Sequence, residues 1–322
     1  MKRAAVILGI VGVGIMSVTV WAGAQSSAQQ TPPPAAGQAA PAAGATTGTA
    51  APATGAPSAP AAKRPPQTKT QPEFDAWKAA AASPDPATME KAADDFATKF
   101  PDSEVRVLLY KNTMRLYQNA NNADKAEAMG RKVLSFDPDD PEALVTVAEV
   151  VAEKTRDTDI DKDQRYAEAI AMAQKAVQTV DTDVQVPAGT PQERIDMYKG
   201  LLRSQAYSII GTIEFKKENY AAAEADLQKS IDAYAIDPDK VVILRLALAL
   251  DKQQKYPEAL KVANRAVELT QKEETSVVGS AARRERDRLQ QLTGGAAPAP
   301  APAPTAAPAP APAPQPQAPP KN

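Results

Sequence analysis

The stretch Tyr256–Val267 reads YPEALKVANRAV and carries the pattern that decides the fold. An aromatic residue and Ala259 are followed by apolar residues and, seven places after Ala259, by a second small residue, Ala266. Residues at such spacings lie on one face of an α-helix. The stretch therefore predicts a helix that packs closely on a neighbouring helix through its small residues.

The pattern of Tyr256–Val267 recurs upstream, and recurrence is the signature of a repeat architecture. It is found at Tyr166–Val177 and Tyr220–Ile231 and, without the aromatic residue, at Asp124–Leu134. Each segment is interpreted as the second helix of a two-helix unit, and Asp-Pro closes two of these units. A generic Ala-rich helical bundle is the alternative, because a high alanine content could mimic the pattern.

These units resemble the tetratricopeptide repeat (TPR) family, whose unit of about 34 residues has small residues at fixed positions. The matching residues are Tyr117, Ala126, Val133 and Pro138; Ala148, Val151, Ala169 and Ala176; Gly211, Ala223 and Ser230; and Ala247, Leu250, Ala259 and Ala266. The resemblance implies an all-α, tetratricopeptide-type helical-repeat solenoid of about four to five helix pairs plus a C-terminal capping helix.

The repeat domain is expected over residues 72–293, where nearly all aromatic and charged residues lie. In the first unit, a helix is predicted to begin at Asp85-Pro86, with Asp85 as the N-cap and Pro86 at the first helical position. Loop insertions are expected at 155–164 and 181–199, the second before a helix that runs to about Lys217. The predicted units are 72–103, 104–140, 141–181, 196–238 and 239–272, with a polar cap at 275–292.

The first 24 residues have the order of a secretory signal peptide. Lys2 and Arg3 precede an uncharged run from Ala4 to Val20, and Ala22-Gly23-Ala24 forms a cleavage site. We therefore expect a periplasmic or secreted protein with no membrane span after cleavage. An uncleaved signal would instead anchor the chain in the inner membrane, because the run is almost long enough to span a bilayer.

Two Pro/Ala-rich segments flank the repeat domain, at 25–71 and 294–322. Neither has enough large apolar residues to offset chain entropy, so both are expected to be disordered arms. Pro-Ala alternation such as Ala297–Pro300 favours an extended, stiff conformation. Such arms could act as spacers associated with a cell wall, or simply as solubilising tails.

Composition narrows the chemistry, because the chain has neither cysteine nor histidine. Zinc sites and nucleophiles that depend on histidine are thereby excluded, and no cofactor is expected. Removing the signal leaves 35 of the 37 basic residues against 39 acidic ones, a net charge near −4. This balance gives no electrostatic reason to expect nucleic acid as a partner.

In the TPR family, inward-facing residues of each first helix form a concave binding groove. Carried over to this chain, the resemblance implies protein-binding candidates at Lys111, Arg115, Gln118, Asn119, Glu149, Glu153, Thr212 and Lys216. Lys111 and Arg115 lie one turn apart and are expected to meet an acidic stretch of a ligand, whereas Glu149 and Glu153 would meet a basic one. The family's carboxylate-gripping groove is not expected, because Arg115 and Thr146 stand where it needs asparagine.

One segment of the sequence is a candidate calcium-binding loop. Asp157, Asp159 and Asp161 have the alternate spacing of an EF-hand loop, and Glu168 falls at its twelfth position. Lys162 stands where that loop needs glycine, so a solvated acidic loop is the expectation.

The function expected from these observations is that of a non-catalytic protein-protein interaction scaffold or adaptor of the cell envelope. The alternative is a carbohydrate- or peptidoglycan-binding protein of the cell wall, or an enzyme of the cell wall that uses carboxylates. Stacked aromatic residues would favour the alternative, but Trp21 and Trp77 are the two tryptophans of the chain, and Trp21 lies in the signal.

Overall fold

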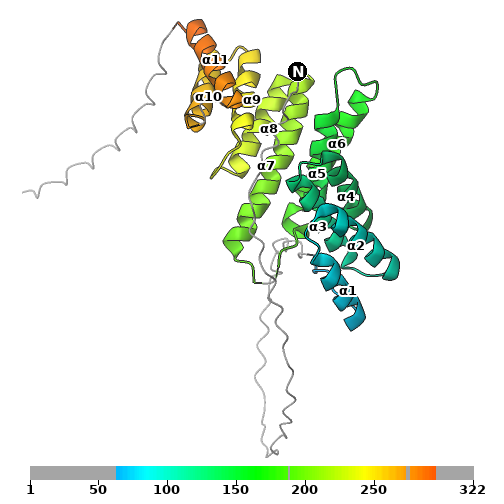
Figure 1. The fold of residues 1–322 in the computed structure, drawn as a ribbon. Helices are drawn as coiled ribbons and strands as arrows, with labels where there is room; N and C mark the ends of the chain where they lie inside the picture. The colour runs from blue at the N-terminus through cyan, green and yellow to red at the C-terminus, as the bar shows by residue number, and fades with distance from the viewer. Residues whose placement is uncertain (1–62, 188, 273–275, 295–322) are drawn as a thin grey trace, which may run out of the picture. The chain divides into compact units, whose positions relative to one another are not determined.

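A computed structural model describes residues 63–187, 189–272 and 276–294, which belong to one compact unit of the chain (Figure 1). The predicted signal peptide, most of the predicted N-terminal arm and the tail beyond Gly294 lie outside the described residues. The described residues contain eleven α-helices: α1 Gln71–Ala81, α2 Pro86–Lys99, α3 Arg106–Asn119, α4 Ala123–Phe136, α5 Pro141–Lys154, α6 Lys162–Asp183, α7 Gln192–Lys216, α8 Tyr220–Ala233, α9 Lys240–Lys252, α10 Tyr256–Leu269 and α11 Val277–Leu292.

The helices pack as successive antiparallel pairs, α1 with α2 through α9 with α10, and α11 covers the last pair. Within the described ranges the secondary structure is entirely helical. The predicted fold class, an all-α helical-repeat solenoid with a capping helix, is confirmed.

Three of the turns within helix pairs are copies of one another. Asn121, Glu218 and Gln254 each occupy the middle of a three-residue turn with positive φ, at 53°, 64° and 62°. In each case the next amide donates to a carbonyl five residues back, over 2.9–3.0 Å. This hydrogen bond closes a helix whose C-terminus turns through a left-handed residue. The repeats are thus equivalent in backbone geometry as well as in sequence.

The small residues of the repeat lie where helices meet. Ala126, Ala169, Ala223 and Ala259 are almost completely buried, as are their partners seven residues later. Gly211 shows why size matters, since a Cβ at this position would lie 2.8 Å from Cγ of Leu227 on α8. Small residues therefore set the distance between paired helices, and the larger residues fill the seam.

The odd-numbered helices form one side of the solenoid, here called the inner face. Contacts join α1 to α3, α5 to α7, α7 to α9 and α9 to α11, whereas the described part shows no comparable contact between two even-numbered helices.

Helix starts follow the sequence rules, while two loop boundaries do not. Asp85 and Asp140 are N-caps whose carboxylates accept the amides of Thr88 and Ala143, each with proline at the next position. The loop predicted at 181–199 is shorter, since α6 continues to Asp183 and α7 already begins at Gln192. Residues 192–199 contain several good helix formers and no proline, so the helix extends back to Pro191.

Part of the predicted disordered linker 25–71 packs against the repeat domain. The Lys63 amide donates to the Thr182 carbonyl over 2.9 Å, and its ammonium group pairs with Asp137 and Asp183. Arg64 pairs with Glu104 over 2.8 Å. The repeat domain therefore extends at least as far back as residue 63, because residues 63–70 carry charges that pair with residues of the domain.

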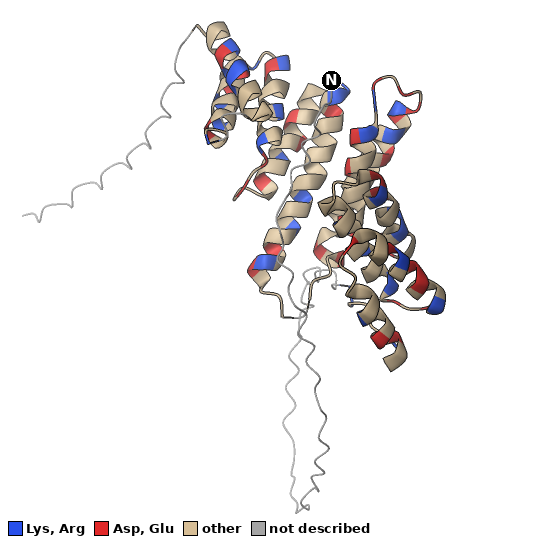
Figure 2. Ribbon diagram, viewed as in Figure 1, with Lys and Arg blue, Asp and Glu red and all other residues tan. Residues whose placement is uncertain are grey.

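No helix in the described ranges is both long and apolar enough to cross a membrane. Charges of both signs are interspersed along the helices (Figure 2).

Candidate functional site

The predicted groove residues fall on the inner face, where the structure divides them into two sections. The closed section consists of Lys111 and Arg115 of α3, Asp140 and Glu142 at the start of α5, and Tyr198 of α7. The open section consists of Glu149 and Glu153 of α5, Thr212 and Lys216 of α7, and Arg245 of α9. The two sections differ in how their charges are satisfied.

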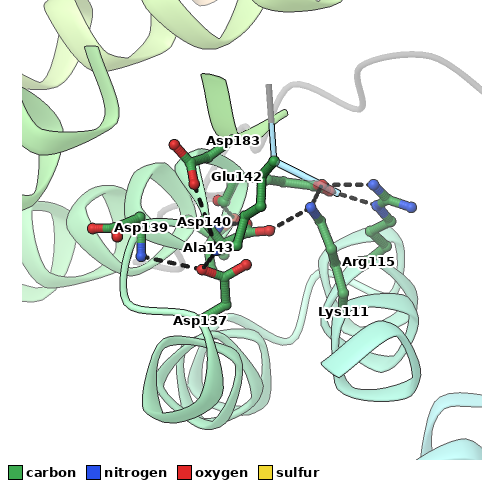
Figure 3. A network of polar contacts seen from close by, with 10 residues as sticks. Lys111, Arg115, Asp137, Asp139, Asp140, Glu142, Ala143 and Asp183 are labelled. Carbon is green, nitrogen blue, oxygen red and sulfur yellow. Dashed lines mark hydrogen bonds and ion pairs between the residues drawn. The ribbon is translucent and has the colours of Figure 1, made fainter. Parts of the chain in front are cut away.

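Lys111 is buried, with 5 % of its surface exposed, and its charge is used within the protein. Its Nζ lies 2.6 Å from an oxygen of Asp140 and 3.2 Å from an oxygen of Glu142 (Figure 3). Burial alone would lower the Lys111 pKa, but these two carboxylates outweigh it and raise the pKa. Lys111 therefore joins α3 to the N-terminus of α5.

Arg115 completes the closed section by gripping Glu142 with two guanidinium nitrogens, Nη2 lying 2.6 Å from Oε2. Burial alone would raise the Glu142 pKa, but Arg115 and Lys111 hold it far below its ordinary value. The buried hydroxyl of Tyr198 lies beside this pair, and burial together with the charge of Glu142 raises its pKa. The prediction that Lys111 and Arg115 meet one acidic ligand is wrong, because both cations are neutralised internally.

The other candidates on α3 differ in what they contact. Nε2 of Gln118 donates to Oγ1 of Thr146 over 3.1 Å, so this side chain also bridges α3 and α5. Asn119 is exposed at the last residue of α3. Asn119 therefore faces solvent, and the Arg115 side chain is also 44 % exposed although its guanidinium group pairs with Glu142.

Glu149 and Glu153 lie one turn apart on α5, and both are exposed. In the described part of the chain neither carboxylate forms an ion pair or accepts a hydrogen bond. The pKa of Glu149 is raised to about 7, first because neighbouring helices reduce its hydration and then because Glu153 and Asp239 carry like charge. Reduced hydration also raises the pKa of Glu153, although Lys216 and Arg245 oppose this.

The cations of the open section have neutral oxygens as hydrogen-bond partners. Nη1 of Arg245 donates to Oγ1 of Thr212 over 2.8 Å, and Nζ of Lys216 donates to the Ala152 carbonyl over 3.0 Å. Reduced hydration lowers the pKa of both groups. Glu153 interacts with both cations at longer range. Acidic and basic groups of the open section therefore lie near one another without forming close pairs.

The calcium candidates are not gathered at one point. Asp159 accepts from the Arg156 amide and from Arg165, and Glu168 pairs with Arg131 of α4 over 2.9 Å. Asp157 lines a pocket of about 480 Å³ together with Lys162, Asp163, Tyr166, Lys216, Lys217 and Glu218. Its three lysines oppose a cation, and within the described residues no cluster of three acidic side chains could hold a metal ion.

Sequence reasoning missed Arg245 and the partners of Lys111. Arg245 is the one charged residue of the run Val241–Leu250, VVILRLALAL, and a lone charge in an apolar helix is a signal that could have revealed it. No comparable signal marks Asp140 or Glu142 as partners of α3. Their pairing depends on the angle at which α5 follows α4.

Comparison with known proteins identifies no family for this chain. No family model matches the chain, and no curated protein matches it. Among solved structures, the chain is similar to YrrB, described as a TPR protein with an unusual peptide-binding site, at 16 % identity and a TM-score of 0.38 over 62 % of this chain and 94 % of that one.

Two further solved structures show the same low level of likeness. A MamA protein has 17 % identity and a TM-score of 0.36 over 58 % of this chain and 88 % of that one. An assembly chaperone of RpL4 has 14 % identity and a TM-score of 0.30 over 66 % and 99 %. The fold assignment therefore depends on the helix pairing and the repeated turns of the chain itself.

Proposed function

We propose that this chain is a non-catalytic scaffold that binds a segment of a partner protein along the open section of its inner face. The observation that carries the proposal is the absence, in the described part of the chain, of any ion pair for Glu149, Glu153, Lys216 or Arg245. Other charges along the inner face are neutralised by neighbours, among them Lys111, Arg115 and Asp251. A partner that supplies both signs of charge would satisfy these four groups.

The partner segment should carry a basic group opposite Glu149 and Glu153 and an acidic group opposite Lys216 and Arg245. A partner segment with its charges in the reverse order would be repelled by like charges on the open section. The arrangement therefore selects the order of charges along the segment as well as their signs. Binding of this kind weakens as salt rises, because the charges on both partners are partly solvated.

The cellular setting is part of the same proposal. The signal-like residues 1–24 support export to the periplasm or beyond, and the Pro/Ala-rich segments would then tether the repeat domain within the cell envelope. Amino-terminal sequencing of the protein recovered from that compartment tests this part, with Gln25 expected as the first residue.

Charge-reversal variants test the binding site directly. Glu149→Lys with Glu153→Lys should reduce partner recovery from envelope extract at least tenfold, and so should Lys216→Glu with Arg245→Glu. The matched control for the glutamate pair is Glu258→Lys with Glu268→Lys, which changes the net charge by the same amount at exposed positions of α10. Quantitative mass spectrometry of the captured proteins gives the readout. Equal recovery by the wild type and both inner-face variants would refute the open section as the binding site.

One observation favours a second candidate, a cell-wall hydrolase. Glu149 has a pKa near 7 beside a second carboxylate, and such pairs perform acid and base chemistry. Neither carboxylate lines the pockets of about 480 and 470 Å³, which argues for a protein ligand instead. Release of soluble fragments from purified peptidoglycan by the wild type, and not by Glu149→Gln, would decide for the enzyme.

A further inference from the structure

A pocket of about 470 Å³ lies away from the inner-face charges, between the first half of α7 and the loop after α8. One wall is a single face of α7, whose residues recur at helical spacing. The other wall is the end of α8 and the following loop. The lining residues are Glu193, Asp196, Met197, Gly200, Ala233, Tyr234, Ala235 and Ile236.

The pocket results from the length of α7, which has 25 residues where its partner α8 has 14. Residues 192–199 extend the helix beyond the start expected for its repeat unit. Gly200 lets this extension approach the end of α8, since a Cβ there would lie 2.7 Å from the carbonyl oxygen of Ala233. At about 1.5 Å per residue, the pocket lies roughly 18 Å along α7 from Thr212 of the open section.

The walls of the pocket present apolar side chains to solvent. Ile236 is 78 % exposed and Met197 is 38 % exposed, and both belong to the few large apolar residues exposed in the described ranges. They come from elements almost forty residues apart and meet at one pocket, which Tyr234 also lines. Exposed apolar residues gathered around a hollow are a common feature of interaction sites.

The charge of the pocket is acidic. Glu193 and Asp196 line it, whereas no lysine or arginine is among its lining residues. Asp196 accepts a hydrogen bond from the neutral Gln192 over 2.8 Å, so its charge stays uncompensated. Within the described residues, Glu193 has no ion-pair partner.

From the apolar walls and the acidic rim, we infer that this pocket is a second docking site, which takes a partner polypeptide segment with a large apolar side chain flanked by lysine or arginine. The apolar side chain fills the hollow between Met197 and Ile236. The basic side chains lie against Glu193 and Asp196. The C-terminal segment 295–322 does not meet this description, because its single charged residue is Lys321 and it has no large apolar residue.

A defined peptide tests the inference without knowledge of the natural partner. The probe is a short fluorescein-labelled peptide in which leucines are flanked by lysines, and its counterpart has glutamate at each lysine. Fluorescence anisotropy with the chain from residue 25 to 322 should show binding of the basic probe at least tenfold tighter than of the acidic counterpart. Equal binding of both probes, or binding of neither, would overturn the inference.

Paired variants localise the binding. Met197→Glu with Ile236→Glu should weaken binding of the basic probe at least tenfold. The control Val277→Glu with Leu292→Glu, also at exposed apolar positions, should leave the affinity unchanged. Glu193→Lys with Asp196→Lys should also weaken binding of the basic probe. Unchanged affinity of the folded pocket variants, judged by circular dichroism, would refute the site.

Three further outcomes distinguish the pocket from competing binding modes. If Glu149→Lys with Glu153→Lys loses probe binding and the pocket variants keep it, the probe binds the open section. This outcome would refute docking at the pocket. A tenfold gain in probe affinity on truncation after Gly294 would indicate that the tail 295–322 occupies the pocket. Self-association in sedimentation velocity that Ile236→Glu abolishes would make a second copy the occupant. Each of the last two outcomes would also overturn the inference.

Discussion

The closed and open sections of the inner face share a helix but use their charges differently. Glu142 and Glu149 lie two turns apart on α5. Glu142 is buried and held by Lys111 and Arg115, whereas Glu149 is exposed and has no close cation in the described part of the chain. The difference arises from the neighbouring helix. Helix α3 places two cations, Lys111 and Arg115, beside Glu142 and none beside Glu149.

This difference shows why a charged residue at a predicted binding position is weak evidence for binding. A buried charge must be paired, because removing it from water costs several kcal/mol. The protein meets that requirement within the closed section. An exposed charge can remain solvated until a partner arrives. The open section therefore retains charges that a ligand can satisfy.

Removal of Glu142 should produce the largest effect. Glu142→Ala leaves Lys111 buried with one carboxylate and deprives Arg115 of its partner, so the free energy of unfolding should fall by about 3 kcal/mol. Glu149→Ala on the same helix should change it by no more than about 0.5 kcal/mol. Urea denaturation followed by circular dichroism measures both. Equal losses in the two variants would erase the distinction between the sections.

Helix packing, rather than ion pairs, should stabilise the part of the solenoid around the open section. Ala223 of α8 is completely buried in a core cluster with residues of α9 and α10, whereas its neighbour Ala222 is exposed. Ala223→Leu should overpack the seam and cost about 1–3 kcal/mol, while Ala222→Leu should stay within about 0.5 kcal/mol. Thermal unfolding of both variants gives the comparison. A destabilised Ala222→Leu with an unaffected Ala223→Leu would contradict the helix register.

The N-terminal segment 63–69 should stabilise the repeat domain by a smaller amount. Lys63 pairs with Asp137, which lies just before α5, and the Lys69 amide donates to Glu73 of α1 over 2.7 Å. A chain that begins at residue 70 should be about 1 kcal/mol less stable than one that begins at 63, because these pairs are partly exposed. Chains that begin at 25 and at 63 should unfold at the same urea concentration. A loss already present on removal of 25–62 would mean that the contacts begin earlier.

The smallest expected effect is the pH response of Glu149. Reduced hydration and like charges raise its folded pKa above the ordinary 4.5, so the folded state binds its proton more tightly than the unfolded state. The free energy of unfolding should therefore fall as pH rises through the range between these two pKa values, and the fall should be small because the exposed carboxylate remains partly hydrated.

Carboxyl carbon shifts in NMR report this titration directly. The Glu149 midpoint should lie clearly above 4.5 and should move down in Glu153→Gln, which removes a like charge. Glu142 should stay ionised through the same range, because Arg115 and Lys111 lower its pKa. Identical midpoints for Glu142 and Glu149 would show that the two sections have the same electrostatic environment.

The sequence alone determined the all-α repeat, because its signals are local. Small residues seven places apart identify the second helix of each pair, and Asp-Pro at 85 and 140 marks where helices start. These features act within a few residues of the chain, so no tertiary information is needed to read them. The extension of α7 was missed because a proline-rich loop was expected to reach further than Pro191.

Only the tertiary structure decided which charges are paired within the protein and which are left without a close ion pair. Lys111 and Lys216 occupy groove positions of the same kind in the sequence, yet Lys111 pairs with Asp140 and Glu142, whereas Lys216 donates to a carbonyl. The pocket beside Met197 and Ile236 likewise joins residues almost forty positions apart. Such pairings depend on how successive helix pairs cross, and crossing geometry arises from side-chain packing across the whole stack rather than from any local run of residues.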